Sequence, residues 1–197
     1  MMTKYSFRNK LAQTLISFSI IFLMNNTIRA NESVDIVSYF QQLENVTGAG
    51  LARKTKLVDV RAAVTGEIII TTIKGEGKET QSPPAKPGDM VVRNRCPETG
   101  NEEILVSRET FLRRYMGPLP KVKKSDWTPY RPKGVQMRFV RVPPNKREFT
   151  FDAPWGEKMV ARPEDVIVQD PTNLRDTYRV AKAAFNCTYE IKQEPSR

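Results

Sequence analysis

The 197-residue chain contains no histidine and only two cysteines, Cys96 and Cys187. Histidine is the usual general base near neutral pH and the commonest metal ligand, so its absence excludes Ser-His-Asp, Cys-His and histidine-metal sites. Two cysteines alone cannot complete a zinc site. We therefore expect no metal ion, and because no cofactor motif is present we expect no cofactor. Catalysis by carboxylates or by lysine remains open.

The first thirty residues have the pattern of a cleavable signal peptide. Basic residues without an acidic one are followed by an apolar run over 11–24, which is shorter than the roughly 20 residues of a membrane span. Polar residues then lead to Ala30, which suits cleavage. An uncleaved N-terminal anchor is the alternative, and the polar stretch favours cleavage. We expect an exported protein, periplasmic or secreted, that begins at Asn31.

Removal of residues 1–30 leaves 28 basic and 22 acidic residues, a net charge of +6. This excess favours an acidic partner without requiring one. The partner classes we expect are an anionic polymer, a membrane surface or another envelope protein. Nucleic acid is less accessible to an exported protein.

Two parts of the chain are similar to each other. Residues 85–92 align with 161–168 at an offset of 76, and the match continues downstream at an offset of 74. The two-residue difference fits a surface turn. Matched spacing on both sides of one small gap favours internal duplication over chance. The downstream matches are Val106 with Val180, Phe111 with Phe185, and Tyr115 with Tyr189.

Each copy is predicted to form a small curved sheet closed by one short helix, with Ser107 capping the first helix. The fold class we expect is therefore α+β: two tandem small mainly-β modules, each closed by a short helix, preceded by one N-terminal helix. The expected strands of copy one are 57–61, 67–73, 89–94 and 103–106, followed by a helix over 108–115, with 74–78 read as a loop. The expected strands of copy two are 135–142, 148–151, 157–161, 165–169 and 177–180, followed by a helix over 181–189.

The Pro-Gly-Asp turn at 87–89, the hairpin that follows it and the Phe-x-x-x-Tyr helix at 111–115 resemble a short repeat module of uncharacterised bacterial and phage proteins. The resemblance covers roughly residues 57–115 and 135–189, and it implies no catalytic residues. Copy two has Glu164 where copy one has Gly88, so we expect its turn to differ.

Ahead of the copies, Ile36, Val37, Phe40 and Leu43 lie on one helical face. We expect this helix to pack on the first module, with a partner-binding helix as the alternative. The organisation that follows is a signal peptide (1–30), an N-terminal helix (31–50), module one (51–116), a basic proline-rich linker (117–133), module two (134–191) and a disordered tail (192–197).

The linker is the candidate binding segment, because basic residues interleaved with aromatic ones bind anionic chains by charge and stacking. Between Lys121 and Arg147 there are nine basic residues and one acidic residue. The alternative is a solvated linker whose aromatic rings cover the edge of a module. The candidate binding residues are Lys121, Lys123, Lys124, Trp127, Tyr130, Arg131 and Lys133.

Two further pairs of residues are candidates for special roles. Asp89 and Asp165 occupy equivalent turns and could act as ligands or catalysts, but such an Asp more often caps its own turn. Cys96 and Cys187 invite a disulfide in an exported chain, although a cysteine on a short helix can simply be a buried small side chain. Without a convergent motif, we expect a non-enzymatic binding or interaction protein with an anionic ligand. An envelope enzyme that uses carboxylates is the alternative.

Overall fold

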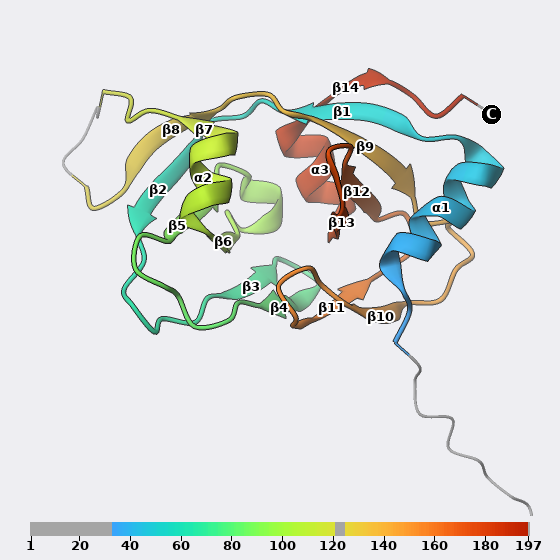
Figure 1. Ribbon diagram of the computed structural model, residues 1–197, viewed down its shortest axis with the longest axis horizontal. Coiled ribbons are helices and arrows are strands. Elements are labelled where there is room, and N and C mark those ends of the chain that lie inside the picture. The colour runs from blue at the N-terminus through green and yellow to red at the C-terminus, as the bar shows by residue number, and fades with distance from the viewer. Residues whose placement is uncertain (1–32, 121–124, 197) are drawn as a thin grey trace, which may run out of the picture. The chain divides into compact units, whose positions relative to one another are not determined.

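The computed structural model describes residues 33–120 and 125–196. The predicted signal peptide and the candidate residues Lys121, Lys123 and Lys124 lie outside the described residues. The fold is mixed α+β and mostly β, which confirms the expected class (Figure 1). Within the described ranges, no helix is long and apolar enough to cross a membrane.

One antiparallel sheet, called here the first sheet, has the strand order β6-β5-β2-β8-β7. Helix α2 (Arg108–Arg114) packs against it through Phe111, and the hydroxyl of Ser107 accepts a hydrogen bond from the Thr110 N–H, as predicted. The strands are β2 (Val58–Ala62), β5 (Met90–Asn94), β6 (Glu103–Val106), β7 (Tyr115–Met116) and β8 (Thr128–Pro132).

The other antiparallel sheet, called here the second sheet, has the order β13-β12-β9-β1-β14. Helix α3 (Lys182–Thr188) packs on one of its faces, where Phe185 meets Phe139. The strands are β1 (Gly50–Lys54), β9 (Gln136–Arg141), β12 (Val166–Asp170), β13 (Asn173–Val180) and β14 (Tyr189–Gln193). Because β14 runs to Gln193, the polar tail begins later than expected.

The two sheets share their strand order and their register. Within each sheet, neighbouring strands pair through equivalent residues. Along the chain, α2 lies between the β5–β6 hairpin and β7, and α3 lies in the same way between the β12–β13 hairpin and β14. The matched cross-strand pairs are Met90–Val106 with Val166–Val180, and Tyr115–Pro132 with Tyr189–Lys54.

Each sheet takes its fourth strand from the other half of the chain. β1 runs directly into β2 but pairs with β9 and β14, whereas β8 runs directly into β9 but pairs with β2 and β7. The boundaries expected at residues 51 and 117–133 therefore need correction: β1 belongs to the second sheet, and β8 is a strand within the expected linker. Pro129 lies where β8 has no β7 neighbour, and proline is tolerated at such an edge.

Helix α1 (Ile36–Thr47) is present as predicted, but it packs on the second sheet rather than the first. The Asp35 carboxylate caps it by accepting the N–H groups of Val37 and Ser38. Phe40 is fully buried against Val140 on the face of the second sheet that α3 leaves open. That uncovered apolar face accounts for the difference.

Two hairpins complete the structure and lie next to each other (Figure 1). The hydroxyl of Thr80 joins them by donating to the backbone carbonyl of Lys158 at 2.9 Å. The sequence did not predict β4, whose residues are polar. The hairpins are β3 (Ile70–Ile73) with β4 (Gly77–Gln81), and β10 (Phe149–Asp152) with β11 (Lys158–Ala161).

Candidate functional site

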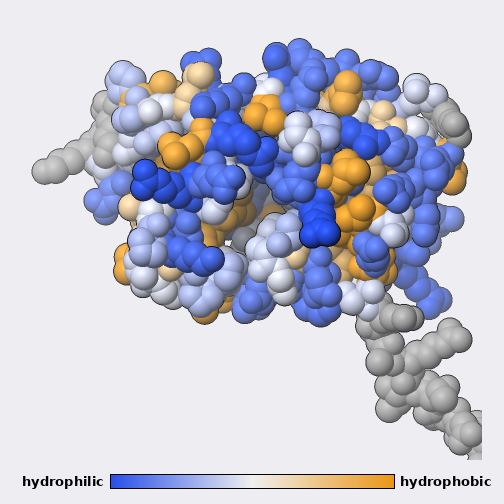
Figure 2. All heavy atoms as spheres, viewed as in Figure 1, coloured by the Kyte–Doolittle hydropathy of each residue, from blue (hydrophilic) through white to orange (hydrophobic). Residues whose placement is uncertain are grey.

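A cleft of about 780 Å³ lies between the two sheets. Its walls come from α2 and β6 on one side and from β13 and α3 on the other, with β4 and the Pro154–Trp155 turn completing it. Figure 2 shows a hollow near the middle of this face, with apolar side chains at depth and hydrophilic ones around it. Residues of both halves of the chain therefore contribute to one cavity.

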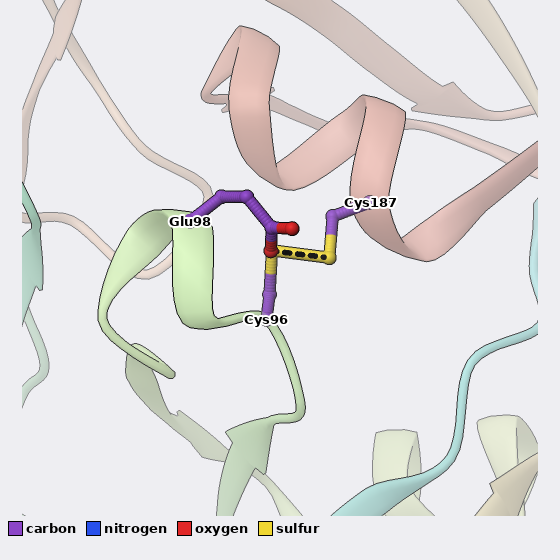
Figure 3. Close-up of side chains that lie close together, drawn as sticks. All are labelled: Cys96, Glu98 and Cys187. Carbon is purple, nitrogen blue, oxygen red and sulfur yellow. Dashed lines mark hydrogen bonds between the residues drawn. A yellow bond between two sulfur atoms is a disulfide. The ribbon is translucent and has the colours of Figure 1, made fainter.

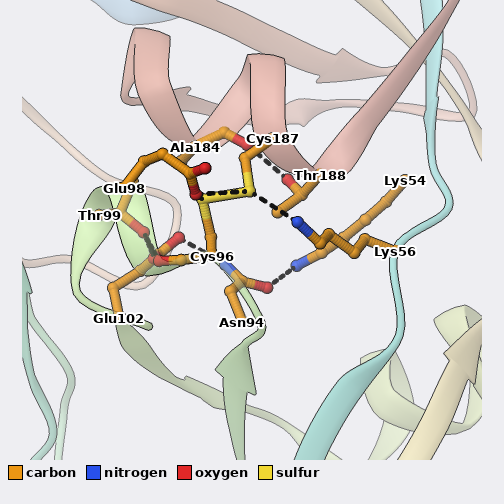
Figure 4. Close-up of a disulfide and its surroundings, with 10 residues drawn as sticks. All are labelled: Lys54, Lys56, Asn94, Cys96, Glu98, Thr99, Glu102, Ala184, Cys187 and Thr188. Atoms are coloured by element: carbon orange, nitrogen blue, oxygen red, sulfur yellow. Dashed lines mark hydrogen bonds between the residues drawn. A yellow bond between two sulfur atoms is a disulfide. The ribbon is translucent and has the colours of Figure 1, made fainter.

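Lys54, at the end of the exchanged strand β1, lines this cleft. Its ammonium Nζ donates to Asn94 Oδ1 at 2.5 Å, and Asn94 Nδ2 donates in turn to Glu102 Oε1 at 2.6 Å (Figure 4). Glu102 also accepts the hydroxyl of Thr99. Among residues 33–120 and 125–196, no carboxylate lies within ion-pair distance of the Lys54 ammonium.

The enclosure of Lys54 changes its acidity. Burial penalises the charged form and lowers its pKa to about 8, although electrostatic interactions with Tyr178 and Glu102 oppose this shift and Arg114 adds to it. The side chain nevertheless keeps part of its surface accessible, because the cleft opens onto it. Lys54 is thus partly neutral near physiological pH.

A buried arginine forms the other charged centre of the cleft. Arg179, whose side chain is fully buried, donates to Glu79 at 2.5 Å, to Glu76 at 2.5 Å and to Asp165 at 2.7 Å. Burial raises the pKa of Glu79 to about 7; Arg179 lowers it, and Glu102 raises it further. Two groups that titrate near neutrality, Lys54 and Glu79, therefore line one cavity.

Two matched tyrosines, Tyr115 and Tyr189, also line the cleft. Tyr115 stacks on Phe111 at 5.2 Å, and Tyr189 stacks on Phe185 at 4.9 Å, so the two matched helices present matched tyrosines. Burial raises the pKa of Tyr115 to about 12 and that of Tyr189 well above its usual value. Both rings remain neutral hydrogen-bonding groups at physiological pH.

The rim of the cleft is charged and largely paired. Arg113 pairs with Asp170, and Arg114 pairs with Asp176 at 2.6 Å. Burial opposes the shift, but hydrogen bonds from Thr172 and Arg113 lower the pKa of Asp170 to about 2. Two further lining cations, Lys86 and Arg175, are exposed and have no ion-pair partner within the described part of the chain. Glu109 is an exposed acid on the same rim.

The two cysteines form a disulfide beside the cleft (Figure 3). Cys96 precedes the short helix η1 (Pro97–Thr99), Cys187 lies on α3, and their Cα atoms are 6.1 Å apart. A carboxylate oxygen of Glu98 lies 3.3 Å from one sulfur and 3.4 Å from the other. Lys56 Nζ lies 3.1 Å from the Cys187 sulfur. Both sulfurs are committed to the bridge, which joins the first sheet's hairpin to the second sheet's helix.

The described candidate binding residues of the linker do not line the cleft. Trp127 lies beneath Arg93, 4.1 Å from its guanidinium carbon, and Tyr130 packs edge-on against Phe111 at 5.1 Å. Arg131 is exposed, and Lys133 Nζ donates to a backbone carbonyl on α2 at 2.6 Å. Tyr130 lies on the interior strand β8 and packs against the core of the first sheet, and Trp127 lies against Arg93 of β5, so this part of the segment is not the solvated linker of the alternative.

The cations further along the chain also have intramolecular contacts. Arg138 pairs with Glu44 of α1, whereas Arg141 lies over the Phe185 ring at 5.7 Å on the opposite face of the second sheet. Arg138 and Arg141 are three residues apart on one strand, so their side chains point to opposite faces. Lys146 lies 5.7 Å from the centre of the Tyr39 ring. These contacts divide the basic segment among several parts of the fold.

Asp89 and Asp165 cap equivalent turns, so the structural interpretation of both is confirmed. Asp89 accepts the backbone N–H of Lys86 at 2.8 Å and that of Arg108 at 3.2 Å. Asp165 accepts the N–H of Arg162 at 2.7 Å and that of Lys182 at 3.1 Å. Each carboxylate thereby fastens its turn to the start of the following helix.

The turn of copy two keeps the geometry of copy one, contrary to our expectation. Gly88 has a φ of 89° and Glu164 a φ of 67°, so both occupy the left-handed region. The caps made by Asp165 hold Glu164 in a conformation that favours glycine.

Sequence reasoning missed Lys54, Glu79 and Arg179. Each lies on a strand with several polar residues, and no neighbouring residue in the sequence indicates that its side chain is enclosed. Only the pairing of β1 with the distant β9 and β14 brings Lys54 to the cavity. Comparison with known proteins adds no further residue: no family model, curated protein or solved structure matches the chain.

Proposed function

We propose that this is an exported, non-enzymatic binding protein that holds a small anionic ligand in the cleft between its sheets. The single observation that carries the proposal is Lys54, an enclosed lysine without a carboxylate partner among the described residues. Burying an unpaired ammonium costs more than burying one that is paired with an anion. A ligand carboxylate or phosphate would supply the missing charge.

The dimensions and rim of the cleft support a small molecule. A volume of about 780 Å³ lies within the range of sites that enclose such ligands. Lys86 and Arg175, which are exposed at the rim and have no ion-pair partner among the residues described, would attract anions from solution. The tyrosine hydroxyls and the Asn94 amide supply neutral polar groups for orientation.

Export is part of the proposal. The N-terminal thirty residues support a cleaved signal peptide, and the disulfide between Cys96 and Cys187 suits an oxidising compartment such as the periplasm or the extracellular space.

The tandem organisation is also a proposal. We infer that the two sheets derive from one duplicated module whose first strand is exchanged between the copies. The shared strand order, shared register and matched caps of Asp89 and Asp165 support it.

Titration of the mature protein with acetate, citrate, phosphate and glucuronate at low and moderate salt tests the ligand. Calorimetry measures the binding. We expect the Lys54→Gln variant to have lost it. The matched control is Lys74→Gln, which removes an exposed lysine outside the cleft and should leave binding unchanged. Equal effects of the two variants would refute the proposal.

Heparin and anionic vesicles belong in the same panel, because the basic segment remains a candidate for larger anions. One variant replaces three lysines of that segment with Gln: Lys121, Lys123 and Lys124. If this variant binds heparin or vesicles more weakly while the Lys54→Gln variant binds them normally, the site lies in the basic segment. Such binding would also weaken steeply as salt rises.

A carboxylate-dependent envelope enzyme is the second candidate. Glu79 favours it, because a carboxyl with a pKa of about 7 suits general acid-base work, and Glu102 lies close enough to influence that pKa. Following bound ligands by NMR over time separates the candidates. Chemical conversion that Glu79→Gln abolishes would establish the enzyme, and an unchanged ligand supports the binding protein.

A further inference from the structure

The geometry around Lys54 singles out its amine among the lysines of the cleft. Lys54 and Lys86 are the two lysines that line it within the described residues, and Lys86 is exposed at the rim. The Lys54 amine has one fixed acceptor, Asn94 Oδ1, and the contact from Asn94 Nδ2 to Glu102 sets which way that amide points. Figure 4 shows this contact between Lys54 and Asn94. The remaining positions on the nitrogen have no hydrogen-bond partner among the described residues and are available to a ligand.

The state of this amine makes it a nucleophile. With a pKa of about 8, half of the Lys54 side chains are neutral at pH 8. An ordinary lysine with a pKa near 10.4 is neutral roughly a hundredfold less often at that pH. Desolvation of a lysine in an apolar surround is a recognised route to an amine that attacks carbonyl carbon.

We propose that Lys54 captures ligands that carry an aldehyde or keto group by forming an imine at its Nζ. This rests on the proposed function, because the cleft must admit the ligand, and it adds the ligand's chemical class: a small anion with a reactive carbonyl.

The step balances without an oxidant or reductant. The Nζ lone pair forms a bond to the carbonyl carbon, and the carbonyl π electrons move to oxygen, which takes up a proton as nitrogen loses one. The resulting hydroxyl then leaves as water with a second proton, and the nitrogen lone pair closes the C=N bond. The product is an iminium ion, which gives the imine when the remaining N–H proton passes to solvent. Glu79, in the same cleft and partly protonated near neutrality, can supply the second proton through solvent.

The groups that face Lys54 shape the pH dependence of this reaction. Glu102 and Tyr178 favour the charged amine, and Arg114 disfavours it. Tyr115, whose ring centre lies 6.0 Å from Nζ, stays neutral over the same pH range. Adduct formation should therefore follow deprotonation of Lys54, with a midpoint near pH 8.

Reductive trapping tests the inference on the intact mature protein. Glyoxylate, a small anionic aldehyde, is added with cyanoborohydride at several pH values, and peptide mass mapping locates the carboxymethyl groups. We expect Lys54 to be labelled at least tenfold faster than Lys86 or Lys74, and acetate to protect it. Equal labelling of these lysines, or no label on Lys54, would overturn the proposal.

Lys54→Arg separates this inference from the proposed function. Arginine keeps the positive charge but cannot form the imine, so acetate binding should persist while the dominant adduct disappears. Anion binding by both proteins with no adduct in the wild type would overturn carbonyl capture alone. Absence of anion binding in the wild type would overturn the proposed function. The wild-type map does not depend on the variant folding.

Discussion

Arg113 and Cys187 occupy the same position in α2 and α3, and each attaches its helix to the hairpin of the opposite sheet. Arg113 pairs with Asp170 at the end of β12, and Cys187 is bonded to Cys96, which follows β5. One of these matched links is ionic and the other is covalent. Both links join the two sheets whose residues line the cleft.

The two links should differ in their contribution to stability. The disulfide spans 91 residues, so removing it by Cys96→Ser with Cys187→Ser should lower the free energy of unfolding by about 4–5 kcal/mol on a chain-entropy estimate. Arg113→Gln removes a half-exposed arginine and should cost about 1 kcal/mol. Guanidinium denaturation measures both values, and equal losses would contradict the prediction.

Asp165→Asn should be more damaging than Asp89→Asn. Both changes weaken the same cap, which costs about 1 kcal/mol, but Asp165 also pairs with the fully buried Arg179, so its loss should reach about 3 kcal/mol. In the first sheet Leu105 stands where the second has Arg179. An Arg179→Leu background is therefore the control: there the two Asp→Asn changes should cost the same in urea denaturation.

Glu164→Gly should stabilise the protein. Glu164 has a φ of 67°, and glycine adopts that region without the penalty of a Cβ. Its exposed pair with Lys182 contributes little, so we expect a net gain of about 1 kcal/mol. The reverse change at the matched turn, Gly88→Glu, should destabilise. A rise in the thermal midpoint for the first variant and a fall for the second constitute the test.

Stability should fall between pH 4.5 and 7 because of Glu79. Burial raises the folded-state pKa of Glu79 to about 7 from a usual value of 4.5, so in this window the folded chain binds a proton that the unfolded chain does not. The stabilisation is present below pH 4.5 and is lost as pH rises through 7, by up to about 3 kcal/mol. Glu79→Gln cannot titrate, so its stability relative to the wild type should improve from pH 5 to 7.5 in urea denaturation. A constant difference would show that Glu79 does not titrate in this range.

The mature protein should begin at Asn31. N-terminal sequencing of native protein is the measurement, and a sequence that starts at Met1 or Met2 would show that the leader is retained.

Most elements were predictable because their periodicity is local. The alternation in 148–151, the cap at Ser107 and the apolar face of Phe40 each determined an element close to where the structure has it. β8 was not predictable, because Pro129 and Pro132 indicate a linker until a neighbouring strand is known. β14 and β4 are polar; β14 pairs with the distant β1, whereas β4 pairs with the neighbouring β3.

The candidate site was less predictable than the fold. The enclosure of Lys54 depends on β1 joining strands that lie more than 80 residues later in the chain. The sequence instead drew attention to the clustered charge around Trp127, whose ring is covered by Arg93. A cluster of like charges can be recognised in the sequence, whereas a buried charge without an ion-pair partner can be recognised only in the three-dimensional structure.

The exchange of β1 and β8 also affects when the protein can fold during its synthesis. β1 is the first strand to be made, and its partner β14 is the last. The second sheet cannot close until β14 has been synthesised, and pairing over such a sequence separation is slow. Neither half of the polypeptide can finish its own sheet, so ribosome-bound intermediates should stay open to proteases and chaperones. Because closure of the second sheet is delayed in this way, the chain stays unfolded enough to pass through a narrow channel until β14 has been made.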